Sequence, residues 1–203
     1  MSTFKVRDNA GRGDGIRETK RRETHRRIAE AGVRLFLERG YEATTLDAIA
    51  EAAEISRRTF FAYFRSKDEI LRSWQLGGWE AFLDDLRQAS PDELPLQAIR
   101  GLFPEHLSRY SADQLKAIAK IMSSSEGLRA TKHAAFAEQE MLLFEVLCEV
   151  WRQPERRLEL RLVAMSAVGA LRVAVERWDL PGNQRPLQQL FVEILDALES
   201  AFP

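Results

Sequence analysis

A stretch of seven residues, 57–63, combines basic, hydroxyl and aromatic side chains at the spacing of a short helix. Arginine can bind the O6 and N7 atoms of guanine through two hydrogen bonds, and threonine can contact a thymine methyl group. A tyrosine hydroxyl can donate a hydrogen bond to a phosphate oxygen. These are the groups that a helix uses when it enters the major groove of double-stranded DNA. The candidate DNA-binding side chains of this stretch are Arg57, Arg58, Thr59, Phe61 and Tyr63.

Flanking residues extend this candidate surface on both sides. Lys67 falls in the first turn of the next expected helix, where unpaired backbone N–H groups also favour a phosphate. Thr44 and Thr45 hold the equivalent position at the start of the preceding helix. Farther upstream, residues 17–27 hold several arginines interleaved with glutamates. That cluster is either a solvated charged face or a source of salt-dependent affinity for the DNA backbone.

A helix of this length is not stable alone, so neighbouring helices must hold residues 57–63 in place. Apolar residues recur at helical spacing from 17 to 39 and again from 46 to 53. The second of these helices can pack on Phe60 and Phe64, which leaves the basic and hydroxyl side chains outside the core. The sequence therefore predicts a three-helix unit that contains a helix-turn-helix.

Capping residues indicate where these helices begin. Thr44 or Thr45 can cap the second helix, and Ser56 can cap the third. Ser66 and Glu69 fit a capping box, which opens a fourth and longer helix. Each cap places a side-chain oxygen where it can accept a hydrogen bond from a backbone N–H that has no partner within its own helix.

The remainder of the chain shows only helical patterning. Pro91, Pro95 and Pro104 divide its first part, so separate helices are expected over 93–102 and 105–110. No segment shows sustained alternation of apolar and polar residues. The predicted fold is therefore all-α, with about nine helices. The later helices are expected over 112–124, 126–152, 155–178 and 186–201.

Charge divides the chain unevenly. Residues 1–72 hold 16 Lys and Arg against 12 Asp and Glu, whereas residues 73–203 hold 14 against 19. A basic first third joined to an acidic remainder indicates that only the first third faces a polyanion. We expect a flexible arm over residues 1–15, a DNA-binding domain over 16–65, and a helical effector-binding and dimerisation domain over 66–203.

Composition excludes several other classes of protein. The single cysteine, Cys148, excludes an intramolecular disulfide and a thiolate cluster, and no metal site or cofactor is expected. The three histidines are scattered and no catalytic motif is present, so we do not expect an enzyme. No apolar run reaches the length of a membrane span, which predicts a soluble protein of the cytoplasm.

A spaced series of residues around the candidate helix agrees with a known pattern. The series is Thr45-Leu46-Asp47-Ala48-Ile49-Ala50, Ala53, Ile55-Ser56, Thr59-Phe60, Tyr63-Phe64 and Ser66-Lys67-Asp68-Glu69-Ile70-Leu71. Over about residues 20–72 the chain thereby resembles the TetR family of transcriptional regulators. The resemblance implies that the equivalents of Tyr63 and Lys67 hold phosphates. It also implies a repressor that binds a palindromic operator as a homodimer and is released by a small effector.

Three positions depart from the pattern of that family. Glu54 stands in the turn where glycine is usual, so the turn needs a left-handed residue other than glycine, or a different bend. Arg58 replaces a common small residue and adds a side chain that can read a base or bind a phosphate. Phe61 stands where tyrosine is frequent, which removes one hydroxyl contact. We expect these positions to set the choice of operator.

The last two expected helices are apolar enough to be buried on two sides. The first of them is either the central core helix of a monomer or part of an interface. By the family resemblance, both would pair with their copies in a four-helix dimer interface and present two recognition helices to a palindromic site. The candidate interface residues are Leu158, Leu162, Met165, Leu187, Phe191, Ile194 and Leu198.

Large side chains are frequent between residues 74 and 151. They are either ordinary core or the lining of an effector pocket that takes a small hydrophobic or amphipathic ligand. The family resemblance implies that the ligand shifts the fourth helix and so changes the separation of the two recognition helices. The candidate pocket residues are Trp74, Trp79, Phe82, Phe103, His106, Tyr110, Met122, Phe136, Met141 and Phe144.

A helical protein-interaction or scaffold module without specific DNA binding is the alternative interpretation. An all-α chain with apolar helices could dimerise and hold other proteins together. That interpretation leaves the basic, hydroxyl and aromatic groups of residues 57–63 unexplained. A DNA-binding transcriptional regulator is therefore the favoured prediction.

Overall fold

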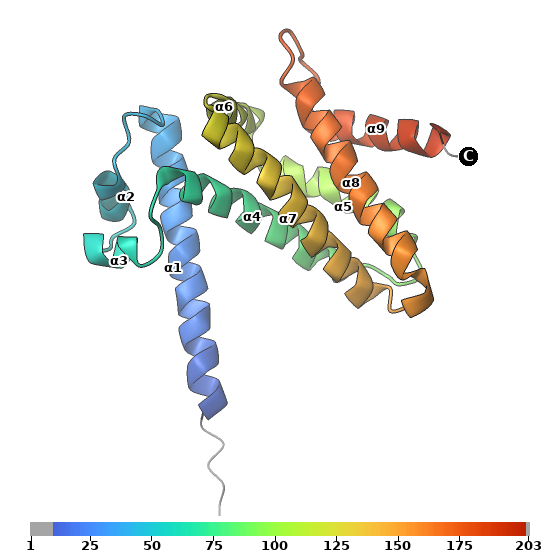
Figure 1. Cartoon of the computed structure of the whole chain (residues 1–203), viewed down its shortest axis with the longest axis horizontal. Helices are drawn as coiled ribbons and strands as arrows, with labels where there is room; N and C mark the ends of the chain where they lie inside the picture. The colour runs from blue at the N-terminus through green and yellow to red at the C-terminus, as the bar shows by residue number, and fades with distance from the viewer. Residues whose placement is uncertain (1–9, 202–203) are drawn as a thin grey trace, which may run out of the picture. The chain divides into compact units, whose positions relative to one another are not determined.

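The computed structural model describes residues 10–201 and, from residue 17 onward, their side chains. Over this part of the chain the secondary structure is entirely helical (Figure 1), which confirms the all-α prediction. None of these helices is long and apolar enough to cross a membrane. The helices are α1 (Ala10–Arg39), α2 (Leu46–Ala52), α3 (Arg57–Phe61), α4 (Lys67–Leu86), α5 (Pro95–Ser108), α6 (Ala112–Ser123), α7 (Glu126–Val150), the short 3-10 helix η1 (Pro154–Arg156), α8 (Arg157–Trp178) and α9 (Leu187–Ala201).

The beginning of the chain differs from the expected flexible arm over residues 1–15. Residues 1–9 lie outside the described part of the chain, but α1 already begins at Ala10, so residues 10–15 are helical. Extension of an existing helix adds one backbone hydrogen bond for each residue that is fixed, which explains how a polar stretch can continue the helix.

Farther along, the chain divides into two compact units between Trp74 and Gln75, inside α4.

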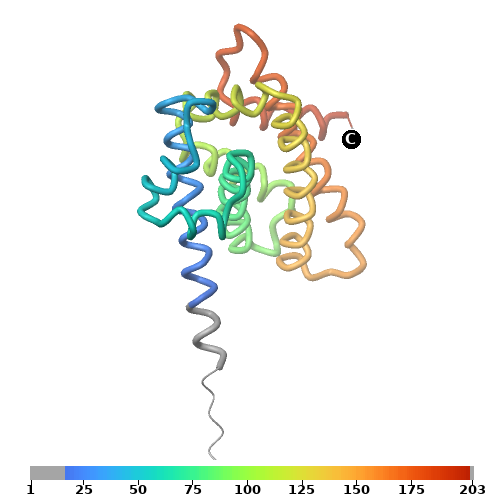
Figure 2. The backbone as a smooth tube through the Cα atoms, turned by 60° about the vertical axis from the view of Figure 1, so that its left-hand side comes forward, coloured from blue at the N-terminus to red at the C-terminus, as the bar shows by residue number. Residues whose placement is uncertain are grey.

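The N-terminal unit is built from α1, α2, α3 and the first turns of α4, and Figure 2 shows the α2–α3 segment against α1. Gly32 of α1 leaves room for a side chain of α4. A Cβ atom added there would lie 2.6 Å from Cγ2 of Ile70, closer than real Cβ atoms come to a neighbour. The buried side chains of this unit include Ile28, Phe36, Ile49, Phe60, Phe64 and Leu71.

Side-chain caps determine where α3 and α4 begin, as predicted. Ser56 Oγ accepts the backbone N–H of Thr59 at 3.1 Å. Ser66 Oγ accepts the N–H of Glu69 at 3.2 Å, and the Glu69 carboxylate accepts the N–H of Arg65 at 2.6 Å. The reciprocal bond of the capping box is therefore made one residue earlier than the sequence pattern suggests. Both caps satisfy N–H groups that have no partner within their own helix.

The turn between α2 and α3 depends on the backbone conformation of Glu54. Its φ is +55°, and it is the only residue other than glycine with a positive φ in the described part of the chain. The turn therefore has the left-handed backbone conformation at Glu54, a conformation that glycine would adopt without strain. A side chain in that conformation costs about 1 to 2 kcal/mol.

The second unit packs the rest of α4 with α5 to α9 around a larger core. Helices α7 and α8 lie side by side, and α8 also packs on α9 and α5 (Figure 1). Aromatic rings from α4, α5 and α9 form a continuous series through this core. The ring centroids of Phe82 and Phe103 are 5.1 Å apart, and those of Phe103 and Phe191 are 4.7 Å apart. This series ties three helices together.

The expectation of two short helices over 93–102 and 105–110 is wrong. A single helix, α5, continues through Pro104. A proline inside a helix removes one backbone hydrogen bond and costs about 3 kcal/mol. Burial of Ile99, Phe103 and Leu107 along one side of α5 offsets that cost, because a break at Pro104 would separate these side chains from the core.

Replacement of Glu54 by glycine should leave the free energy of unfolding unchanged or raise it by up to about 1 kcal/mol, because glycine adopts a positive φ without strain. A Glu54→Val variant should lower it by about 1 to 2 kcal/mol, since a β-branched side chain fits the left-handed region badly. Urea unfolding followed by circular dichroism measures both changes.

The matched control for this prediction is Glu51→Gly, which places glycine inside α2 and should cost about 1 kcal/mol. Equal losses in Glu54→Gly and Glu51→Gly would contradict the assigned role of the Glu54 backbone.

Candidate nucleic-acid interface

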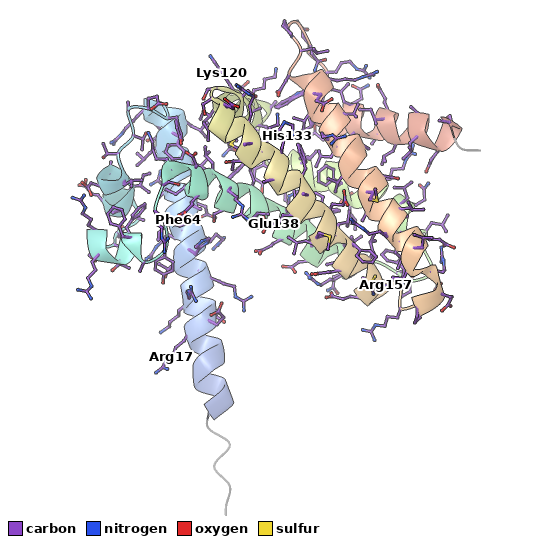
Figure 3. The ribbon with its side chains drawn as sticks, viewed as in Figure 1. Arg17, Phe64, Lys120, His133, Glu138 and Arg157 are labelled. Atoms are coloured by element: carbon purple, nitrogen blue, oxygen red, sulfur yellow. The ribbon has the colours of Figure 1, made fainter. Side chains whose placement is uncertain are left out.

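Helix α3 buries one side and exposes the other. Phe60 is fully buried, and Phe64, which Figure 3 marks beside α1, is buried just after the helix ends. A five-residue helix held by two buried aromatic rings and a serine cap has its outward direction set by those anchors. The side chains on its exposed side are Arg57, Arg58, Thr59 and Phe61.

Arg57 is held between α2 and α3. Its Nε atom lies 3.2 Å from Oδ1 of Asp47, and its guanidinium lies 5.6 Å from the ring centroid of Phe61. Because both members of the ion pair are more than half exposed, the pair restricts the direction of Arg57 more than it stabilises the fold. Asp47 was not predicted as part of the site, and its place in the first turn of α2 is the only sequence signal that pointed to it.

Arg58 and Thr59 differ in how far they are already engaged. Arg58 is exposed and has no ion-pair or hydrogen-bond partner among residues 17–201. The hydroxyl groups of Thr59 and Ser56 are 2.8 Å apart, so Thr59 shares its hydroxyl with the cap of α3. The guanidinium of Arg58 therefore keeps all its donors for an external acceptor.

Tyr63 lies at the edge of the core and is half-buried. Its ring centroid is 6.3 Å from that of His25 on α1, and the His25 ring stacks on Phe64 at 4.4 Å. The Nδ1 atom of His25 lies 3.2 Å from Oγ of Ser73. Helices α1 and α4 thus support the tyrosine ring through one imidazole.

Lys67 joins α4 to the loop between α1 and α2. Its Nζ donates to the carbonyl of Tyr41 at 2.7 Å and lies 4.4 Å from the centroid of the Tyr41 ring. A longer contact of 3.4 Å reaches the carbonyl of Glu42. The Tyr41 hydroxyl donates to the carboxylate of Asp68. The pKa of the Tyr41 phenol is raised, mainly by burial and secondly by its hydrogen bond to Asp68. Tyr41 was not predicted from the sequence, because nothing in its spacing links it to Lys67.

Thr44 and Thr45 are placed differently from one another. Thr44 is buried, with 3% of its surface exposed, and its hydroxyl is in reach of the carbonyls of Gly40 at 2.8 Å and Leu35 at 3.2 Å. It closes the end of α1, and burial removes it from the candidate DNA-binding set. Thr45 is exposed, caps α2, and accepts the N–H of Ala48 at 3.2 Å.

Several candidate pocket residues form one cluster in the second unit. The rings of Trp79 and Phe103 have centroids 5.7 Å apart, and those of Phe103 and His106 are 6.4 Å apart. Burial, and secondarily the charge of Arg109, lowers the pKa of His106, so its imidazole is neutral at neutral pH. The Tyr110 ring lies 5.7 Å from that of His106.

Other candidate pocket residues lie elsewhere. Met141 is 49% exposed, so it does not line an interior site, and Trp74 is the last residue of the N-terminal unit. Met122 is buried and Phe136 is half-buried. Phe144 is covered by the guanidinium of Arg157, 4.9 Å from its ring centroid. In the part of the chain that the structure describes, no group of three or more His, Cys, Asp or Glu side chains could hold a metal ion.

Helix α8 is apolar on two opposite sides. Its inner side is buried in the core, whereas Leu158, Leu162 and Met165 on the outer side are 72%, 53% and 47% exposed. The candidate interface residues on α9 are placed differently, because Leu187 and Phe191 are buried within the protomer. They are core residues and not interface residues, since their side of α9 packs on α5 and α8. The two remaining candidates, Ile194 and Leu198, are half-buried.

A Lys67→Ala variant should lower the free energy of unfolding by about 1 to 2 kcal/mol, because it removes charge-assisted hydrogen bonds that join α4 to the loop after α1. Arg58→Ala is the control and should change it by less than about 0.5 kcal/mol, since that side chain is exposed. Urea unfolding of both variants tests the difference. An unchanged midpoint for Lys67→Ala would show that these contacts add nothing to stability.

Comparisons with known proteins agree with this geometry. Residues 28–73 match the family described as bacterial regulatory proteins, tetR family. The HTH-type transcriptional regulator TcmR of Streptomyces glaucescens is 32% identical over 202 residues, which cover 94% of this chain and 88% of that protein. The Fatty acid metabolism regulator protein of Bacillus subtilis is 23% identical over 190 residues, covering 89% of this chain and 96% of that protein.

Solved structures share the fold. FadR of Thermus thermophilus, a TetR-family repressor in complex with lauroyl-CoA, is 24% identical with a TM-score of 0.55, covering 88% of this chain and 95% of that one. SmeT, the repressor of a Stenotrophomonas maltophilia multidrug efflux pump, is 18% identical with a TM-score of 0.57, covering 89% of each chain. The chain belongs to the TetR family of bacterial regulatory proteins, and it is a DNA-binding transcriptional regulator and not an enzyme.

Proposed function

We propose that the protein is a repressor that binds a palindromic operator as a homodimer in the cytoplasm and leaves it when a small effector binds. The observation that carries this proposal is that α3 exposes two adjacent arginines, Arg57 and Arg58, while Phe60 of the same helix is buried. Such an arrangement points base-reading donors away from the core while the helix itself stays fixed.

The two arginines of α3 have separate tasks in this proposal. Arg58, which has no partner within the described residues, reads a base edge through its paired N–H donors. Arg57 is oriented by Asp47 and Phe61, so it reaches DNA from one fixed direction. Phosphate contacts set the register of α3 on the duplex. The side chains that make these contacts in the proposal are Thr45, Thr59, Tyr63 and Lys67.

The outer side of α8 is the proposed dimer interface. An exposed apolar stripe on an otherwise packed helix favours burial against a second copy. Ile194 and Leu198 of α9 are half-buried and can extend it. Two-fold symmetry would give the dimer two copies of α3, which explains why the operator should be palindromic.

The second unit is the proposed sensor. Two relatives by fold are described with small ligands: FadR with lauroyl-CoA and SmeT with triclosan. The buried ring cluster around Phe103 offers a comparable apolar environment in this chain. A ligand releases the operator only if it favours a conformation of the dimer that binds DNA less well.

Replacement of Arg58 by Ala should weaken binding to the operator about 5- to 150-fold, because one base contact is lost, and the double variant Arg57→Ala, Arg58→Ala should lose specific binding. Selection of genomic DNA fragments by the purified protein identifies the operator, and fluorescence anisotropy then measures affinity. Arg177→Ala, on an exposed arginine at the end of α8, is the matched control. Unaltered specific binding by the double variant would refute the assignment of α3.

A Leu162→Glu variant should dissociate the homodimer and weaken operator binding about 100-fold or more, because the two half-sites are then bound independently. Sedimentation velocity measures the oligomeric state. The control is Leu94→Glu, which alters a leucine that is 62% exposed but lies before α5. A Leu162→Glu protein that remains dimeric would exclude the outer side of α8 as the interface.

A further inference from the structure

Basic and acidic residues alternate along the sequence near the start of α1, but the helix sorts them onto different sides. Three exposed basic residues fall at positions i, i+3 and i+4, so they share one side of α1, and Thr24 at i+7 continues it. These three residues, called the basic stripe below, are Arg17, Lys20 and Arg21. Glu18 and Glu23 fall at i+1 and i+6, outside that side. Between residues 17 and 24 the stripe therefore contains no carboxylate.

The arginines on the other side of α1 are paired, whereas the basic stripe is not. Nε of Arg22 lies 3.8 Å from Oε1 of Glu18, and the Arg26 guanidinium lies 3.4 Å from Oε1 of Glu30. The side chains of the stripe have no ion pair or hydrogen bond with any side chain of residues 17–201. Like charges three and four residues apart repel one another and destabilise a helix. An external anion would relieve that repulsion.

The stripe lies one turn beyond the residue that supports Tyr63. The ring of His25 on α1 stacks on Phe64 at 4.4 Å and lies 6.3 Å from the Tyr63 ring centroid. Arg21 and Arg17 stand about 6 Å and about 12 Å farther along the helix axis than His25. Helix α1 projects past α3 at this end (Figure 1), and Arg17 lies on the projecting part (Figure 3). The stripe thus continues the surface that the proposed function assigns to phosphates through Tyr63.

The same side of α1 becomes apolar where it enters the core of the N-terminal unit. Ile28, Ala31 and Leu35 continue the spacing of the stripe and are buried. The basic stripe therefore lies on the side of α1 that packs on the other helices of the unit, but in the turns that precede this packing. A charged face whose only task was solvation would be expected on the opposite side of the helix.

We propose that Arg17, Lys20 and Arg21 form a second DNA-binding surface, which holds phosphates next to those held by Tyr63. Guanidinium and ammonium groups bind phosphate oxygens, and duplex DNA presents one phosphate for about every 1.7 Å of its axis. The contribution of the stripe to affinity is therefore electrostatic and independent of base sequence. This inference rests on the proposed function and extends the DNA contact beyond the helix-turn-helix.

The test compares two double variants of the full-length protein. Arg17→Gln, Arg21→Gln alters the stripe, and Arg22→Gln, Arg26→Gln is the matched control. Both pairs are spaced by four residues on one helix, lose the same charge and gain a good helix former. Circular dichroism should therefore give equal helicity for both.

Fluorescence anisotropy between about 50 and about 200 mM salt measures binding to the operator found by selection and to a non-operator duplex of equal length. The stripe variant should lower the slope of log Kobs against log salt by about 2 to 4, because each lost phosphate contact removes about 0.9 and a homodimer has two stripes. Affinity for both duplexes should fall by similar factors. The control should change the slope by less than about 1. An unchanged slope, or equal changes in the two variants, would overturn the proposal.

Hydroxyl-radical footprinting locates the contact on the operator. The stripe variant should lose protection of backbone positions at one edge of each half-site and keep protection where α3 binds. Footprints identical to that of the unaltered protein would overturn the proposal.

The two duplexes separate this inference from the proposed function. If the operator is bound specifically and the stripe variant keeps the original slope, the proposed function stands and the second surface fails. If no sequence is bound specifically but the stripe variant alone lowers the slope on the non-operator duplex, the second surface stands and the proposed function fails.

Discussion

The burial of Phe60 is the constraint on which the position of α3 depends. Helix α3 has only five residues, too few to be stable by its own hydrogen bonds. Its position comes from one fully buried ring and from the Ser56 cap. With Phe60 buried, Arg58 lies on the opposite side of α3, whereas Arg57 is exposed at the start of the helix and is oriented by Asp47. The direction of the proposed DNA-reading side chains is therefore a consequence of a hydrophobic contact.

Polar groups in or near the two cores differ in whether each atom has a hydrogen-bond partner. In the N-terminal unit, the Thr44 hydroxyl and the Lys67 ammonium both meet backbone carbonyls, which secures the loops around α2. In the second unit, Gln139 and His106 each keep an atom without a partner in the described part of the chain. The first pattern stabilises the loops, and the second leaves buried polar atoms whose desolvation is not offset by a hydrogen bond within the described residues.

Features with local causes could be predicted from the sequence, and features with distant causes could not. The caps at Ser56 and Ser66 were correct because each depends on residues three positions apart. The continuity of α5 through Pro104 was missed, since it depends on what buries Phe103. The burial of Thr44 and the exposure of Met141 were missed for the same reason: hydrophobicity and hydrogen-bonding capacity do not say which side of a helix or loop faces the core. Asp47 escaped notice because its partner, Arg57, lies on a different helix.

The lack of a side chain at Gly32 has a consequence for the packing of α1 and α4. The Ile70 side chain of α4 occupies the space where a Cβ atom at position 32 would be, so a larger residue there would force α1 or Ile70 to shift. Helix α4 is one uninterrupted element from Lys67 to Leu86, so it begins in the N-terminal unit and ends in the second. The packing of the first turns of α4 on α1 therefore depends on a position where the chain has no side chain.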